Sequence, residues 1–174
     1  KIIHQHDPED LLGPFGQFIY DLNCILNIRK SNFDIVLQLG YTSSSIWGKL
    51  LPNTSVIVTN MDGLEWKRSK YNKPVQVFLK FAEKLAINTS GFLVSDSIGI
   101  QAYLKDKYDK SSEYIAYGAN IFLNPEEDVI KHYNISPHKY NLLIARLEPE
   151  NNIETILDGV VLNNNVTPFL VIGK

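Results

Sequence analysis

The residues best suited to chemistry lie in one segment, VTNMDGLEWKRSKYNKP at positions 58–74. Between Asp62 and Lys84 the chain has six Lys or Arg residues and three Asp or Glu residues, although its formal net charge is -2. Carboxylates accept hydrogen bonds from hydroxyl groups, an indole covers the apolar face of a sugar ring, and cations hold oxyanions. The segment therefore predicts a site for a sugar and a phosphate. Its chemically active side chains are Asp62, Glu65, Trp66, Lys67, Arg68, Lys70, Tyr71 and Lys73, grouped around Gly63.

The same segment fits a second interpretation, the solvated start of a helix whose Trp66 packs on the core. Weaker signals lie elsewhere. Gly40, Tyr41 and the polar run 42–45 could admit a ligand or begin a helix. Asp96 and Ser97 are expected to cap a helix, with a place in the ligand site as the alternative. The H-x-H pair at positions 4–6 has no clear third ligand in the sequence, so we predict no metal site.

These residues need elements to position them, and short apolar runs alternate with helical stretches along the chain. Because the runs are almost entirely apolar, they indicate parallel strands buried on both faces. Ser97 and either Asn151 or Asn152 are expected to act as helix N-caps. The predicted strands are 34–40, 55–60, 91–96, 112–118, 140–146 and 167–174, and the predicted helices are 15–29, 74–88, 97–108 and 152–163.

Strands that alternate with helices predict right-handed βαβ crossovers and an α/β fold, a parallel sheet with helices on both faces. Such sheets bind ligands at the carboxyl ends of their strands. We therefore expect the strand exits at 39–41, 59–63, 94–97 and 116–119 to lie on one edge. The stretch 119–138 interrupts this alternation of strands and helices. It predicts a first domain over 1–122, a linker over 123–138, and the first βαβ unit of a second domain over 139–174.

Composition excludes several classes of protein. Hydrophobic residues make up 44% of the chain and charged residues 21%, which argues against intrinsic disorder. The near-neutral charge balance gives no reason to expect a nucleic-acid partner. Cys24 is the only cysteine, so an internal disulfide and a cysteine-built zinc site are both excluded. No apolar run reaches the roughly 18 residues that a membrane-spanning helix needs.

Several strings, in order, resemble one family. NMDGLEWKRSKY, a following helix with FAEKLA, then LVSDSIGIQAYL and YIAYGANI are similar to the rhamnosyltransferase-type branch of the bacterial family-4 glycosyltransferases. ARLEPENNIETILDGV resembles the first helix region of the C-terminal domain in the same enzymes. Members of this branch often carry the label "domain of unknown function" on their N-terminal half. The resemblance, which runs through essentially the whole chain, implies a GT-B architecture. In it two Rossmann-like domains face each other, the N-terminal one holding the acceptor and the C-terminal one the nucleotide-sugar.

The resemblance also implies site residues. Many family-4 enzymes have a His where this chain has Met61 and Asp62, so Asp62 becomes the expected contact to acceptor or sugar hydroxyls. These enzymes place an Arg after the first strand of the C-terminal domain and a Lys about five residues later. Arg146 matches the Arg and Asn151 replaces the Lys, which makes these two the expected donor-binding residues. The expected acceptor-binding residues are Gly40, Tyr41, Asn60, Gly63, Glu65, Trp66, Lys67 and Arg68.

The implied activity is transfer of a hexose or deoxyhexose, with rhamnose expected, from a nucleotide diphosphate sugar such as dTDP-rhamnose to a lipid-linked saccharide in the synthesis of capsule or other surface polysaccharide. The resemblance implies retention of configuration with neither metal nor cofactor. Catalysis would rest on positioning and on stabilisation of the leaving group. The second hypothesis is a non-catalytic module with the same fold that binds sugar or nucleotide, or serves as a scaffold.

We further expect a cytoplasmic protein that lies peripherally at the inner face of the membrane. The cluster Lys67, Arg68, Lys70 and Lys73 would contact anionic headgroups or, alternatively, the acceptor's diphosphate. We also expect the chain to be a piece of a longer enzyme. Such a piece would fold but not catalyse, because a GT-B site needs both walls of its cleft.

Overall fold

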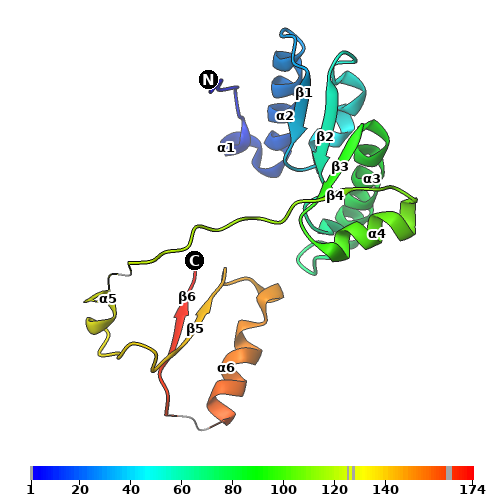
Figure 1. Cartoon of the computed structure of the whole chain (residues 1–174). Helices are drawn as coiled ribbons and strands as arrows, with labels where there is room; N and C mark the ends of the chain where they lie inside the picture. The colour runs from blue at the N-terminus through cyan, green and yellow to red at the C-terminus, as the bar shows by residue number, and fades with distance from the viewer. Residues whose placement is uncertain (1, 125, 127, 164–165) are drawn as a thin grey trace. The chain divides into compact units, whose positions relative to one another are not determined.

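The computed structural model describes residues 2–124, 126, 128–163 and 166–174, so residues 125 and 127 of the predicted linker lie outside the described residues. The chain divides into two compact units, Lys1–Gly118 and Ala119–Lys174 (Figure 1). The assignment of an acceptor side and a donor side to these units stays a prediction. No helix among the described residues is long and apolar enough to cross a membrane.

The first unit is built on a parallel sheet with the strand order β1-β2-β3-β4. Its strands are β1 (Ile35–Gln38), β2 (Val56–Asn60), β3 (Phe92–Ser95) and β4 (Glu113–Tyr114). Its helices are α1 (Glu9–Leu12), α2 (Gly16–Ile28), α3 (Lys73–Thr89) and α4 (Ile98–Tyr108), with 3-10 turns η1 (Gly13–Phe15), η2 (Ser44–Leu50) and η3 (Glu65–Lys67).

The second unit contains the predicted βαβ arrangement. Strand β5 (Asn141–Ile144) pairs in parallel with β6 (Phe169–Ile172), and α6 (Ile153–Leu162) lies between them in the sequence. The short helix α5 (Asp128–Lys131) precedes β5, and the 3-10 turn η4 (Pro149–Asn151) precedes α6. The predicted α/β class, a parallel sheet followed by a further βαβ unit, is therefore confirmed.

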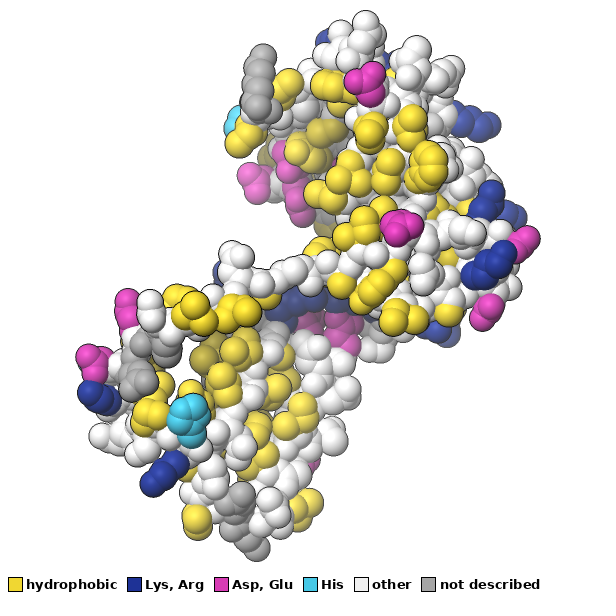
Figure 2. Space-filling view, in the orientation of Figure 1, with side chains coloured by type: hydrophobic (Ala, Val, Ile, Leu, Met, Phe, Trp, Pro, Cys, Tyr) yellow, Lys and Arg dark blue, Asp and Glu magenta, His cyan; other side chains and the backbone are white. Residues whose placement is uncertain are grey.

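The described helices of the first unit pack on one face of its sheet, although helices on both faces were expected. The packed face carries Ile57 and Leu93, each in one of the two buried clusters that the helices complete. On the opposite face Ile35, Leu37 and Phe92 are 63%, 58% and 66% exposed. Hydrophobic side chains gather over this region of the sheet (Figure 2). The apolar runs predicted strands correctly, but within the described residues their second face has no helical cover.

Helix starts are fixed by polar side chains. Asn72 caps α3 by accepting a hydrogen bond from the Val75 N–H at 3.1 Å, and Ser97 caps α4 by accepting from the Ile100 N–H at 3.3 Å. The cap at Ser97 confirms the prediction. For α6 the predicted N-cap position at Asn152 is confirmed, but the side-chain bond expected there does not form within the described ranges. Asn152 holds the N-cap position without a side-chain cap bond among the described residues, and the Asn151 side chain donates to the Arg146 carbonyl at 2.6 Å.

A buried carboxylate ties α3, α4 and η3 together. Glu83, on α3, is 1% exposed, yet it lies among donors from two other segments, η3 and α4. It accepts hydrogen bonds from the Trp66 indole at 3.0 Å and the Tyr103 hydroxyl at 2.7 Å. The Tyr108 hydroxyl also donates to it, and the Lys107 ammonium lies 3.2 Å away. A buried charge is tolerated only when it is paired and hydrogen-bonded in this way.

We predict that Glu83→Ala lowers the free energy of unfolding of the first unit by about 3 kcal/mol, because removal of one partner leaves the Lys107 charge and three partly buried donors without their acceptor. Glu113→Ala, at an exposed position on β4, is the matched control. Both tryptophans of the chain, Trp47 and Trp66, belong to this unit, so urea unfolding followed by their fluorescence reports on it. Equal effects of the two substitutions would contradict the structural role of Glu83.

Candidate functional site at the carboxyl edge of the sheet

The strands of the first unit all run parallel, so their carboxyl ends lie at the same edge of the sheet. The segments that follow β1, β2 and β3 begin at Leu39, Met61 and Asp96. Two of the predicted site positions, Asn60 and Asp62, are thereby placed beside the exit of β3, because β2 and β3 are paired neighbours. This edge is where a parallel sheet places its ligands.

A pair of carboxyl groups occupies the edge. Asp62 follows β2 and Asp96 follows β3. Loss of hydration on partial burial raises the pKa of Asp62, and so does the nearby charge of Asp96. Glu65 raises this pKa further, while Arg68 lowers it. Asp62 therefore holds its proton to a higher pH than an isolated Asp does. Sequence reasoning gave Asp96 a capping role, but Ser97 alone makes that bond.

Two acceptor atoms at this edge, one of them on Asp96 itself, have no donor among the described residues. Asn60 is 8% exposed, and its side-chain amide donates to the Tyr117 hydroxyl at 3.3 Å. Its Oδ1 atom and the Oδ1 atom of Asp96 are both buried, and neither has a hydrogen-bond partner among the described residues. A buried acceptor without a donor costs free energy, so a native site of this kind calls for an explanation. Because both atoms lie beneath the accessible surface, a donor reaches them only when side chains at this edge move, and a ligand hydroxyl that reached them would supply a missing bond.

The loop after Asp62 is held in a defined shape. Gly63 has a φ of +66°, a left-handed conformation that favours glycine. The buried hydroxyl of Tyr41 donates to the Gly63 carbonyl at 3.2 Å. Burial raises the pKa of Tyr41, so this hydroxyl stays protonated. Arg68 forms an ion pair with Glu65 at 3.2 Å, which closes the loop on itself.

Trp66 anchors the loop to the helices. Its indole N–H donates to Glu83, and three ammonium groups lie about its ring. The Nζ atoms of Lys67, Lys80 and Lys107 are 5.4, 4.9 and 5.0 Å from the ring centroid. The bond to the buried Glu83 fixes Trp66 against the helices, although Trp66 belongs to neither of the two buried clusters. Stacking of Trp66 on a sugar stays a prediction.

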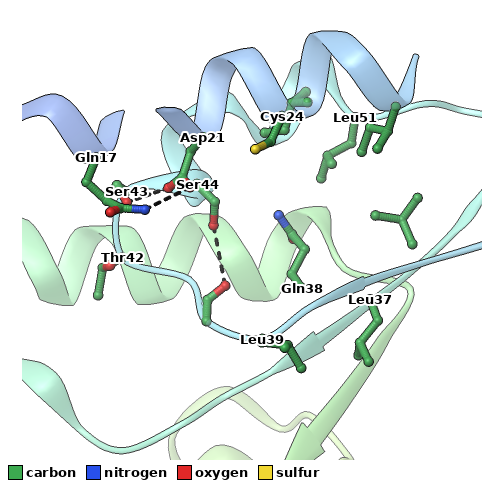
Figure 3. Close-up of a pocket in the computed structure, with 14 residues that line it drawn as sticks. Gln17, Asp21, Cys24, Leu37, Gln38, Leu39, Thr42, Ser43, Ser44 and Leu51 are labelled. Atoms are coloured by element: carbon green, nitrogen blue, oxygen red, sulfur yellow. Dashed lines mark hydrogen bonds between the residues drawn. The ribbon is translucent and has the colours of Figure 1, made fainter. Parts of the chain in front are cut away.

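A cavity of about 400 Å³ lies between α2 and β1 (Figure 3). Gly40 lines it, and a Cβ atom added there would meet no atom within 4 Å, so the backbone is open to close approach. The polar end is built on Asp21, which accepts from the Ser43 hydroxyl and, at 3.2 Å, from the Gln17 amide. Sequence reasoning missed Gln17 and Asp21. Their one signal is a polar pair spaced four residues apart, but Asn23 and Asn27 have the same spacing on this helix, so the pattern does not single them out.

The second unit brings the two expected donor-binding residues together. Arg146 is exposed just after β5, and Asn151 contacts its main chain through the hydrogen bond described above. Their role in holding a donor stays a prediction. Across the described ranges of the chain, no group of three or more His, Cys, Asp or Glu side chains could hold a metal ion. His4 and His6 therefore have no third ligand within those ranges.

The chain is similar to one protein family. Residues 45–120 match a family described as a domain of unknown function (DUF1972). This match contains β2, the loop from Asp62 to Arg68, and Asp96. It therefore includes the carboxylate pair and its supporting helices, but not the cavity residues of α2. No curated protein matches the chain.

We predict that Asp62→Asn stabilises the first unit at pH 7, because the folded pKa of Asp62 lies above its ordinary value of 3.8 and its ionisation therefore opposes folding. The gain should be a few tenths of a kcal/mol up to about 1 kcal/mol, since Asp62 is largely exposed and its charge is screened. It should vanish as the pH falls through the folded pKa, where the wild-type carboxyl is protonated.

Urea unfolding at pH 7 and pH 3, followed by tryptophan fluorescence, measures this difference. Asp106→Asn, at an exposed position on α4, is the matched control and should change little at either pH. If Asp62→Asn loses stability at pH 7, or if its gain persists at pH 3, then ionisation of Asp62 does not destabilise the folded state.

Proposed function

We propose that this chain forms the acceptor-side wall, and the beginning of the donor-side domain, of a GT-B glycosyltransferase. The reaction is transfer of a hexose or deoxyhexose, such as rhamnose, from a nucleotide diphosphate sugar to a lipid-linked saccharide. The sugar, the donor and the acceptor rest on the resemblance of NMDGLEWKRSKY and ARLEPENNIETILDGV to family-4 enzymes. The DUF1972 match over residues 45–120, to a domain found in glycosyltransferase-associated proteins, supports the coarser part of this assignment.

One structural observation carries the proposal. The Oδ1 atoms of Asn60 and Asp96 are buried acceptors without partners among the described residues, and Asp62 adds a third acceptor group beside them. A ligand that satisfies this set must donate several hydrogen bonds from closely spaced groups. Vicinal hydroxyl groups of a saccharide do so, whereas an anion would be repelled by the two carboxyl groups.

In this proposal Asp62 orients an acceptor or sugar hydroxyl and does not attack the sugar. Its raised pKa makes it a better proton acceptor than an ordinary Asp, and its hydrogen bond would place the reacting oxygen. Tyr41 and Trp66 are positioning residues, because they hold the loop that carries Asp62. The rate would come mainly from positioning and from stabilisation of the departing phosphate. Arg146 is the cation of this chain that we assign to that phosphate.

A binding module without turnover remains the competing function, and it predicts the same hydroxyl-accepting site. The two functions differ in turnover alone. The natural protein that carries this chain, assayed with a panel of nucleotide-sugars and a lipid-linked saccharide, should transfer or hydrolyse the donor. Saturable binding without turnover would support the binding module.

For the natural protein we predict that Asp62→Asn lowers kcat/KM for the acceptor by about 100-fold, the size of effect expected from loss of one positioning or proton-accepting group. The same substitution should leave the fold intact, since it removes a repulsion. Asp106→Asn is again the control and should keep the wild-type value. Near-full activity in Asp62→Asn would make Asp62 a structural residue and would remove it from the proposed site.

A further inference from the structure

A second cavity lies beside the first and differs from it in chemistry. It has a volume of about 740 Å³, within the range of small-molecule sites, and its lining is mostly apolar. One wall comes from η1 and α2 and the other from the first turns of α3. The apolar side chains that form it include Phe15, Phe18, Pro74, Val75, Phe78 and Leu79. We call it the apolar groove.

Both walls of the apolar groove are fixed by local structure. Gly16 lets α1 approach α2 closely, because a Cβ atom there would lie 2.5 Å from the backbone of Glu9. Phe18 and Phe78 pack edge to face across the floor, with their ring centroids 5.7 Å apart. On the other side Gln76 donates to the Tyr71 carbonyl at 3.1 Å and so holds the start of α3. The groove is therefore formed before any ligand binds.

The apolar groove has charged residues of both signs about it, because Glu9 of α1 lines it and two lysines lie next to lining residues at its α3 end. Tyr71 lines it, and the Nζ atom of Lys70 lies 5.3 Å from the Tyr71 ring centroid. Lys73 is exposed and directly precedes Pro74, which also lines the groove. Both cations are solvent-exposed at the start of α3. The two ammonium groups at the α3 end outnumber the one lining carboxylate, Glu9, so that end of the groove is complementary to the anionic head of a long hydrocarbon chain.

The apolar groove is continuous with the cavity beside β1. Gln17, Thr42 and Ser43 line both cavities, so these three residues form the wall that the two share. The cavity beside β1 is polar at this wall, where Ser43 and Gln17 donate to Asp21. A ligand with its chain in the apolar groove can thus extend a polar portion toward the carboxyl edge of the sheet.

We propose that the apolar groove binds the hydrocarbon chain of a phosphorylated long-chain lipid, with the phosphate held by Lys70 and Lys73. The identity of the natural ligand, a lipid-linked saccharide, rests on the proposed function. Binding of the amphiphile itself does not. The site fits one hydrocarbon chain and not a bilayer surface. The apolar residues form a bounded groove, and the two lysines lie at one end of it.

The test is calorimetric titration of the whole chain with dodecyl phosphate below its critical micelle concentration. We expect saturable binding. Octyl phosphate should bind at least about tenfold more weakly, since each buried methylene adds to affinity, and inorganic phosphate should show no saturation over the same range. Equal binding of inorganic phosphate would reveal a plain anion site and overturn the proposal. Binding to phosphatidylglycerol vesicles without binding to the monomer would replace it with a membrane-surface role.

Variants locate the site. Val75→Glu places a carboxylate in the groove at a helix position where Glu supports capping, so the fold should survive. It should weaken dodecyl phosphate at least about tenfold. Val77→Glu, on the same helix and 70% exposed, is the matched control and should bind as the wild type does. Phe15→Ser, at the 75% exposed edge of the other wall, is a second groove variant that tests the same point.

The phosphate end is tested by Lys70→Gln combined with Lys73→Gln, against Lys84→Gln on the same helix as Lys73. The double substitution should weaken dodecyl phosphate about tenfold or more, while Lys84→Gln should not. Equal loss from Val75→Glu and Val77→Glu, or no loss from the lysine pair, would overturn the proposal. None of these probes contains a sugar, so failure here leaves the glycosyltransferase proposal standing, and failure of the transfer assay leaves this binding intact.

Discussion

The first unit depends on one buried charge. Glu83 is almost completely removed from water, and its carboxylate is tolerated because Trp66, Tyr103, Tyr108 and Lys107 all point to it. These partners come from η3 and α4, so the interaction couples the loop after β2 to two helices. The loop that carries Asp62 begins at Met61, which is buried in the core. Beyond Met61, its position relative to the sheet edge follows from the Trp66 anchor, from the Tyr41 bond to Gly63 and from the Glu65–Arg68 pair.

Local signals in the sequence predicted much of the fold. Apolar runs marked the strands because parallel strands pack with little polar surface, and Ser97 marked the start of α4 because its side chain caps that helix. Two features of the fold could not be predicted from local sequence alone. Strand β4 is only Glu113–Tyr114, far shorter than the apolar run suggests, because its pairing depends on how far β3 extends. Nor does periodicity tell which face of a sheet receives its helices.

Only part of the candidate site could be predicted from the sequence, because the rest depends on tertiary structure. Asp62 follows a strand exit, which sequence can show, but its partner Asp96 comes from a neighbouring strand, and strand order is a tertiary property. Glu83 did leave a signal, since it lies four residues after Leu79 on the apolar face of its helix, where a charge is rare. Phe18 and Phe78 were read only as core positions of their helices, because spacing cannot distinguish a filled core from an open groove.

The central claim is that the carboxyl edge of this sheet accepts hydrogen bonds from a saccharide. A crystal structure of the natural protein with a bound acceptor saccharide tests it most directly. The account predicts sugar hydroxyl oxygens within about 2.5–3.2 Å of Asn60 Oδ1 and Asp96 Oδ1, so that both acceptors gain donors, with Asp62 contacting the same sugar. A saccharide bound elsewhere, with Asn60 Oδ1 and Asp96 Oδ1 still without partners, would contradict it.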